Sequence, residues 1–113
     1  MKILFWNARG LGGDRAFRIL QSLLRDNRPE MVFLIETMCD RNAMEVLRVK
    51  LGFDAKLVVV WEGNSGGLCL LWKGVVDVDL VSYSRFHIDT VVTNINNKKW
   101  RMTGFYGHPI SSQ

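Results

Sequence analysis

The stretch Met31-Val32-Phe33-Leu34-Ile35, closed by Glu36, decides how this chain folds. Its unbroken run of apolar residues, bounded by polar ones, predicts a buried β-strand. A similar apolar run from Lys2 to Asn7 lies upstream and is followed by a turn-forming, glycine-rich segment. We therefore expect two buried strands, each with a polar residue at its carboxyl end.

Helical patterns follow both of these runs. Asp14 is expected to cap a helix with apolar residues at helical spacing, and Arg28-Pro29 ends it because proline disfavours helical geometry in the preceding residue. Asp40 is expected to cap a second helix, which ends at Gly52. Because a helix crosses between the two strands, they should be parallel, with a right-handed connection.

Beyond the second helix the pattern changes to a succession of strands. Short turns rich in glycine and asparagine separate them and favour antiparallel hairpins. Acidic residues alternate with apolar ones in one of these stretches, which indicates one buried and one wet face. The sequence thus predicts an α/β protein, a mixed sheet with both helices packed on one side. The five expected strands are Lys56 to Trp61, Leu68 to Trp72, Val76 to Ser84, His87 to Thr93 and Lys99 to Tyr106.

The composition is that of a folded domain with a basic balance. Hydrophobic residues make up 48% of the 113 residues and charged ones 23%, which excludes a disordered chain and suits one domain or a piece of one. The net charge of +4 is compatible with a polyanionic partner such as nucleic acid. Cys39 and Cys69 provide neither a disulfide framework nor a zinc-ligand spacing, so we expect buried thiols. With no signal peptide and no apolar run near the ~20 residues of a membrane span, the chain is expected to be intracellular, in the nucleus or the cytoplasm.

Two polar residues stand where ligands commonly bind. In parallel α/β units the ligand lies outside the carboxyl ends of the strands, and Asn7 and Glu36 occupy such ends. If the strands are neighbours, the amide and the carboxylate converge, and an oxygen-only pair of this kind suits Mg²⁺. On the pattern alone a structural interpretation is favoured, with Asn7 as a turn residue and Glu36 as the residue ahead of a helix cap.

Four segments carry a resemblance to a known family. Ile3 to Leu11 and Pro29 to Thr37 resemble the first strand with its loop, and the second strand, of the endonuclease/exonuclease/phosphatase superfamily. Ser65 to Lys73 and Trp100 to Pro109 resemble the branch carried by plant LINE-type (non-LTR) retrotransposons. The resemblance implies that residues 1–113 are the N-terminal half of such an endonuclease domain, which is half of a four-layer α/β sandwich.

The same resemblance implies roles for three residues. Glu36 would be the ligand of a Mg²⁺ cofactor, and Asn7 would lie at the edge of the metal site and orient the attacking water or the scissile phosphate. Tyr106 would direct its hydroxyl at the phosphate; without the resemblance, a core or interface tyrosine is the better interpretation. The partner of intact relatives would be DNA.

The sequence departs from the superfamily in its catalytic set. The His–Asp pair that activates water and the Asp-x-Asn motif are expected after Tyr106 and do not occur in these residues. His87 is expected to be a surface or structural histidine, and His108 matches a non-catalytic loop position. We therefore expect a truncated Mg²⁺-dependent DNA endonuclease domain, inactive alone. The alternatives are a non-catalytic, basic nucleic-acid-binding module, or a phosphatase-type member acting on a phosphorylated small molecule or lipid headgroup.

A half domain of this kind has a physical consequence. We expect the chain to supply about one sheet with its helices, so that the inner sheet face lacks a partner and the last strand offers an unpaired edge. Self-association through that exposed sheet face, or poor solubility, would follow.

Overall fold

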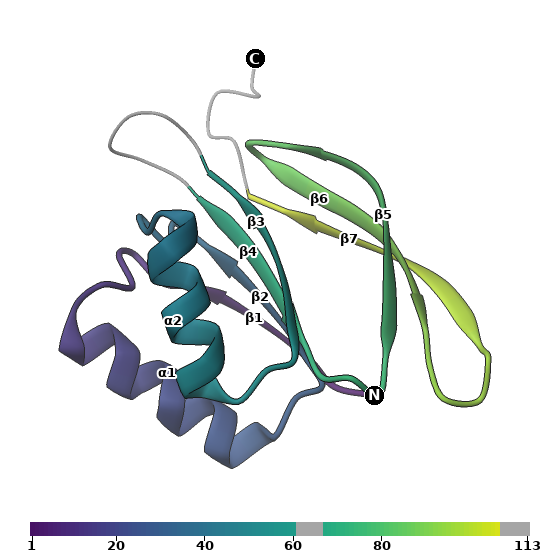
Figure 1. Ribbon diagram of the computed structural model, residues 1–113, viewed down its shortest axis with the longest axis horizontal. Helices are drawn as coiled ribbons and strands as arrows, with labels where there is room; N and C mark the ends of the chain where they lie inside the picture. The colour runs from purple at the N-terminus through teal and green to yellow at the C-terminus, as the bar shows by residue number, and fades with distance from the viewer. Residues whose placement is uncertain (61–66, 107–113) are drawn as a thin grey trace.

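The computed structural model describes residues 1–60 and 67–106, which fold into three layers (Figure 1). Two helices, α1 (Asp14–Asn27) and α2 (Arg41–Leu51), cover one face of a four-stranded sheet. A three-stranded sheet packs on the opposite face. Of the helices described, neither is long and apolar enough to cross a membrane.

The first sheet is mixed, as the sequence pattern predicts. Its strands lie in the order β1 (Ile3–Asn7), β2 (Met31–Ile35), β4 (Leu68–Trp72) and β3 (Ala55–Val59). β1 runs parallel to β2, and the other neighbours are antiparallel. Residues 31–34 are buried because alternate side chains of β2 pack against the helices on one face and the second sheet on the other.

The helix ends match the sequence pattern in α2 and differ in α1. Asp40 caps α2 by accepting a hydrogen bond from the Ala43 N–H at 2.8 Å, and Gly52 ends the helix in the left-handed conformation at φ +80°. In α1 the capping residue is Gly13, and Asp14 is already the first helical residue. The expected Asp14 cap is therefore wrong, although a carboxylate in the first turn still interacts favourably with the helix N-terminus.

The second sheet is an antiparallel meander of β5 (Asp77–Ser84), β6 (His87–Thr93) and β7 (Lys99–Phe105). Its inner face contributes Ile88, Val92 and Met102 to a core shared with the first sheet. At one contact between the two sheets, Gly104 of β7 packs against the ring of Phe33 in β2. A Cβ atom at position 104 would lie 2.7 Å from that ring, so the close approach requires glycine.

The expectation of a single sheet with an uncovered inner face is wrong. After β4 the chain turns at residues 73–76, where the Val76 N–H donates to the Lys73 carbonyl at 3.1 Å, and the following strands form a separate sheet. Alternation of polar and apolar residues identifies the buried face of a strand, but it does not specify which sheet the strand joins. The face expected to mediate self-association is covered. An open edge remains at β1, where Phe5 is 53% exposed beside Phe33.

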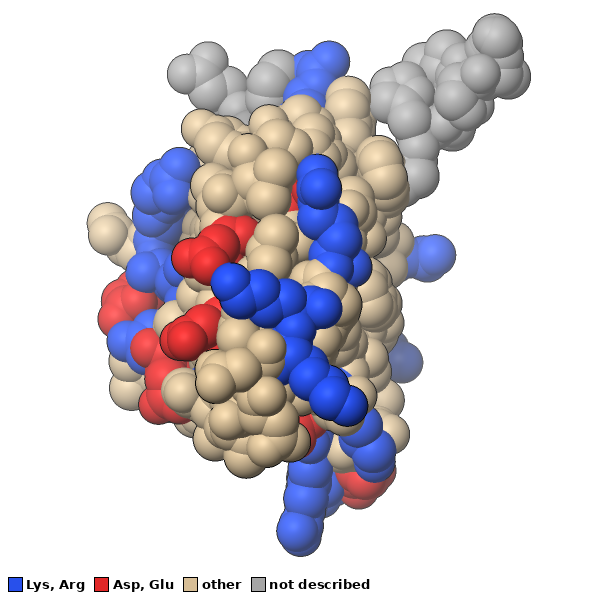
Figure 2. Space-filling model, turned by 90° about the vertical axis from the view of Figure 1, so that its right-hand side faces the viewer, with Lys and Arg blue, Asp and Glu red and all other residues tan. Residues whose placement is uncertain are grey.

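The outer face of the second sheet is turned toward solvent. Figure 2 looks onto this side of the molecule, where Lys and Arg side chains cross the surface in several places and acidic ones are fewer. Asp89 of β6 lies on this face and accepts hydrogen bonds from Arg101 at 2.8 and 2.6 Å and from Thr103 at 2.9 Å. The Arg101 guanidinium, with the Thr103 hydroxyl, lowers the pKa of Asp89 to about 2.

The two cysteines are free thiols within the structure, as predicted. Cys69 is fully buried in β4, and burial raises its pKa to about 12. Cys39 is half-buried beside the core between the helices and the first sheet, where burial and the charge of Asp40 raise its pKa. Neither thiol is therefore set up as a nucleophile, since reactivity requires the thiolate.

Candidate functional site

Three strand ends meet at one edge of the sandwich and bring the residues singled out from the sequence together. Asn7 is the last residue of β1, Glu36 directly follows β2, and Tyr106 directly follows β7. β1 and β2 are parallel neighbours, so Asn7 and Glu36 lie at the same sheet edge. β7 belongs to the other sheet, and the site therefore spans the junction between the two sheets (Figure 1).

Asn7 holds the carboxylate of Glu36. Its Nδ2 donates to Glu36 Oε2 at 2.9 Å, in a partly buried position. Its Oδ1 accepts a hydrogen bond from the Arg9 N–H at 3.0 Å. Both polar ends of the Asn7 amide are thus occupied, and the oxygen faces the loop after β1 instead of lying beside the carboxylate.

Tyr106 approaches the same carboxylate from the second sheet. Its hydroxyl lies close enough to Glu36 for hydrogen bonding to that carboxylate, with partial desolvation and the negative charge of Glu36, to raise the pKa of Tyr106. At neutral pH the hydroxyl is therefore protonated and acts as a donor. Phe86 holds the tyrosine in place: the rings stack with centroids 6.3 Å apart, and the Tyr106 N–H donates to the Phe86 carbonyl at 2.7 Å.

The loops that follow β1 and β2 are joined by backbone hydrogen bonds and contain unusual conformations. Arg9, Glu36 and Met38 all have positive φ, at +48°, +53° and +52°. Non-glycine residues in this region are costly and are found preferentially at functional sites. The hydrogen bonds that stabilise the loops run from Ala8 N to Ile35 O at 3.0 Å, from Gly10 N to Glu36 O at 2.8 Å, and from Leu11 N to Thr37 O at 2.9 Å.

The residues present fit a weakly held divalent cation better than a dedicated metal cage. Within residues 1–60 and 67–106 there is no group of three or more His, Cys, Asp or Glu side chains that could share a metal ion. Glu36 is half-buried and supplies the one carboxylate at this edge that contacts Asn7 and Tyr106. Mg²⁺ commonly takes one or two carboxylates and keeps several waters, which this arrangement allows. Glu36 is therefore the candidate metal ligand at this edge, and Asn7 is the residue that orients it.

His87, at the start of β6, contacts β5 and not the candidate site. The ring nitrogens of His87 lie 3.0 Å from Ser82 Oγ and 2.6 Å from Ser84 Oγ, where they tie β5 to β6. Its neighbour Ile88 faces the core, so His87 faces the outer side of the sheet, away from Glu36. His108 lies outside the described residues.

Sequence reasoning missed two residues at this edge. Phe86 gives no signal in the sequence because its stacking partner, Tyr106, comes from another strand. Thr37 is fully buried next to Glu36, and its Oγ1 has no hydrogen-bond partner among the residues that the structure describes. Gly67 packs against that hydroxyl so closely that a Cβ there would lie 2.6 Å from it. The packing of Thr37 against Gly67 therefore helps to fix the loop that contains Glu36.

Comparison with known proteins shows the fold. No family model matches this chain, and no curated protein matches it. Solved structures do match it. D. rerio TDP2, complexed with a single-strand DNA product, has a TM-score of 0.63 and 20% identity over 99% of this chain and 49% of its own. The AP endonuclease LMAP from Leishmania major has a TM-score of 0.63 and 15% identity over 97% of this chain and 42% of its own.

A third match comes from bacteria. The 3′ phosphatase NExo from Neisseria, bound to a product DNA hairpin, has a TM-score of 0.58 and 20% identity over 94% of this chain and 41% of its own. These structures belong to the endonuclease/exonuclease/phosphatase superfamily. The chain shares the α/β fold of these three structures and spans less than half the length of each.

Proposed function

We propose that this chain is the N-terminal half of a metal-dependent phosphodiesterase domain that acts on DNA. The observation that carries the proposal is the convergence of Asn7, Glu36 and Tyr106 at the junction of the two sheets. Each comes from a separate strand end. The parallel pairing of β1 and β2 brings Asn7 to Glu36, and the packing of the second sheet brings Tyr106 to them. Further support comes from the DNA-bound neighbours that share the fold.

Each residue has a chemical part in this proposal. Glu36 would hold Mg²⁺, which when bound polarises a phosphoryl oxygen and stabilises the leaving oxygen. Asn7 orients the Glu36 carboxylate through one N–H of its amide, and the second N–H would contact the water or the scissile phosphate. Tyr106 keeps its proton at neutral pH, and its single O–H would turn from Glu36 to donate a hydrogen bond to a phosphate oxygen as negative charge develops.

The described residues do not supply a base that could activate water at this edge. His87 faces the outer side of the second sheet, and the thiol of Cys69 is buried with a raised pKa. From the resemblance, in which the His–Asp pair comes after Tyr106, we propose that the chain is inactive alone and that cleavage belongs to intact relatives. The proposed origin, a plant LINE-type retrotransposon, rests on the sequence resemblance of residues 65–73 and 100–109. The proposed location is intracellular, in the nucleus or the cytoplasm.

Two further proposals follow from charge and from the open edge. A non-catalytic nucleic-acid-binding role is favoured by the net charge of +4 and by the basic side chains on the outer face of the second sheet (Figure 2). A phosphatase-type member is favoured only by the fold that this chain shares with the 3′ phosphatase NExo. Self-association would use the edge beside Phe5, because the sheet face first expected to mediate it is covered.

The decisive experiment separates metal binding from cleavage. Mn²⁺ would be titrated as a stand-in for Mg²⁺ and followed by electron paramagnetic resonance, with wild-type protein and the isosteric variant Glu36→Gln. In parallel, nicking of supercoiled plasmid would be measured in Mg²⁺ and in EDTA. We expect Glu36-dependent metal binding without nicking. Glu36-dependent nicking would support the phosphodiesterase and contradict the inactivity, whereas identical Mn²⁺ binding by both proteins would refute the metal site.

A further inference from the structure

A basic groove lies at the end of the molecule opposite the candidate site. It has a volume of about 680 Å³ and lies between the carboxyl-terminal ends of α1 and α2. Its apolar floor contains Leu24, Pro29, Leu51 and Phe53. We call it the distal groove. Its rim carries four cations and one acid, namely Arg25, Arg28, Lys50, Lys73 and Glu30.

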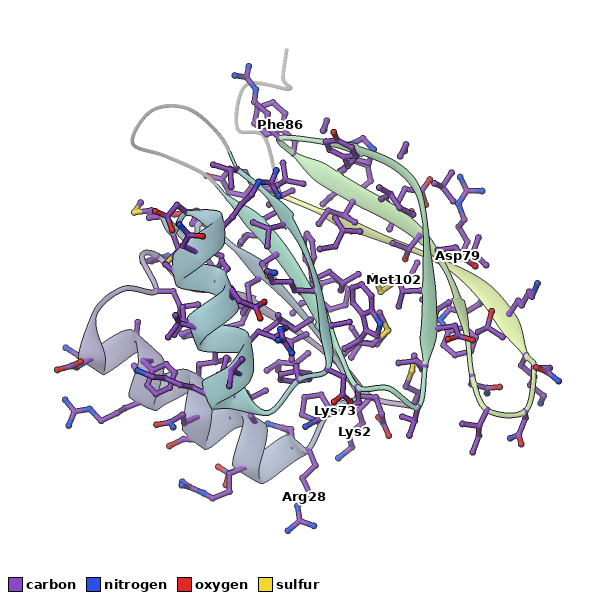
Figure 3. All side chains as sticks on the ribbon, viewed as in Figure 1. Lys2, Arg28, Lys73, Asp79, Phe86 and Met102 are labelled. Carbon is purple, nitrogen blue, oxygen red and sulfur yellow. The ribbon has the colours of Figure 1, made fainter. Side chains whose placement is uncertain are left out.

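The distal groove and the candidate site occupy opposite ends of the same strands. Figure 3 shows Arg28, Lys73 and Lys2 at the lower end of the fold, whereas Phe86, which stacks on Tyr106, lies at the upper end. β1 and β2 each contain five residues, and at ~3.3 Å per residue they separate the two ends by roughly 17 Å. The groove is therefore a separate surface.

Few of these cations are neutralised by neighbours. The guanidinium of Arg28 makes no ion pair or side-chain hydrogen bond within the described part of the chain. The ammonium of Lys50 lies 5.9 Å from the centroid of the Phe17 ring, and that of Lys73 donates to the Gly52 carbonyl at 2.7 Å. Arg25 forms one long ion pair with Asp26, at 3.8 Å.

Interaction with the helix termini explains only some of the basic residues on the rim. Cations near a helix carboxyl terminus interact favourably with its free carbonyls, which accounts for Arg25 and Lys50 in the last turns and for Lys73 on Gly52. It does not account for Arg28, which follows α1 in the left-handed conformation at φ +48°. Glycine is the usual residue at such a position, so the arginine there has a backbone cost that interaction with the helix terminus does not explain.

We infer that the distal groove binds the phosphate groups of a single-stranded nucleic acid, independently of the metal site. Guanidinium groups pair with phosphate oxygens in a bidentate manner, and ammonium groups add point charge. An open groove with a cationic rim suits a strand that passes over it. The choice of nucleic acid as ligand rests on the proposed function, because the cations alone recognise only phosphate.

The test measures binding of a fluorescein-labelled 20-nucleotide DNA strand by anisotropy, in EDTA and at several salt concentrations. The test variant is Arg28→Gly with Lys50→Gln, which removes one cation from each helix end. Arg28→Gly suits the local backbone, so the fold should be retained, and thermal melting would verify this. The matched control is Arg15→Gln with Arg18→Gln, which removes the same charge from exposed positions of α1.

We expect the test variant to bind DNA about tenfold more weakly than the wild type, and the control less than about threefold more weakly. For the test variant, the slope of log K against log salt should flatten by ~0.7 for each phosphate that it no longer neutralises. Equal losses in both variants, or no loss in the test variant, would overturn the inference. Inorganic tripolyphosphate provides a further arm. If it binds in a manner that depends on Arg28 while DNA does not bind, the ligand is a free polyphosphate and the nucleic-acid assignment is wrong.

The outcome is distinguishable from failure of the proposed function. The test variant, Arg28→Gly with Lys50→Gln, should bind Mn²⁺ as the wild type does, because both residues lie at the other end of the strands from Glu36. If this variant loses Mn²⁺ binding together with DNA binding, the two surfaces are not independent and the inference fails. Absence of Mn²⁺ binding by the wild type would refute the metal site and leave the groove unaffected.

Discussion

The two sheets of this small sandwich carry unequal parts of the structure. In the first sheet, β2 is buried on both faces between the helices and the second sheet. In the second sheet, β5 is mostly exposed, and Leu80 retains 44% of its accessible surface. The first sheet therefore holds the core, and the second covers one face of that core while bringing Tyr106 to Glu36. A site at the junction therefore depends on how closely the second sheet packs against the first.

The largest expected effect comes from removing the side chain at the centre of the junction. Phe33→Ala should lower the free energy of unfolding by about 3–5 kcal/mol, because the ring is buried against Gly104 and beside Phe5. Leu80→Ala on the exposed β5 should cost less than about 1 kcal/mol, since little apolar surface is removed from the core there. Chemical denaturation measures both, and similar losses would contradict the unequal roles of the sheets.

A smaller effect is expected from adding one methyl group between the sheets. Gly104→Ala places a Cβ 2.7 Å from the Phe33 ring, so the sheets must separate, at a cost of about 1–3 kcal/mol. Phe33→Leu removes part of the ring and should recover some of this loss in the double variant. A double-mutant cycle that shows simple additivity would mean that the two positions do not press on each other.

Acid should weaken an ion pair in each half of the sandwich. Arg48 and Lys56 lower the pKa of Glu45 to about 2 and link α2 to β3, while Arg101 does the same for Asp89 on the outer face of the second sheet. A lowered carboxyl pKa contributes stability above its unfolded value near ~4, and this is lost as the pH falls toward 2.

The measurement is the melting temperature between pH 7 and pH 2. Glu45→Gln and Asp89→Asn should each flatten the acid limb of that profile by removing one titrating group. An unchanged acid limb in both variants would show that these pairs do not contribute.

The smallest expected effect is spectroscopic and concerns the contact between the sheets at the site. The hydrogen bond to Glu36 raises the pKa of Tyr106, so Glu36→Gln should lower that pKa toward the ordinary tyrosine value. The stabilising bond is fully present at neutral pH and is lost as the pH rises through the raised pKa. The chain has two tyrosines. Ultraviolet titration in a Tyr83→Phe background would therefore report Tyr106 alone, and an unshifted titration would show that the two residues do not meet in solution.

Local sequence determined the elements and part of the site. The apolar run before Glu36 predicted β2 at its observed bounds, and Asp40 and Gly52 predicted both ends of α2, because caps and periodicity depend on neighbouring residues. The contact between Asn7 and Glu36 also follows from sequence, since a helical crossover makes β1 and β2 parallel and places their carboxyl ends together.

Only the tertiary structure decided how the later strands divide between two sheets. A strand with one buried face can belong to the same sheet as the preceding strands or to a second sheet. The alternation of polar and apolar residues is the same in both cases. The division places β7 over β2, brings Tyr106 to Glu36, and covers the face that was expected to be bare. The distal groove likewise exists only because packing places the ends of α1 and α2 side by side. The sequence shows which residues are basic, but only the packed helices show which of them lie near one another.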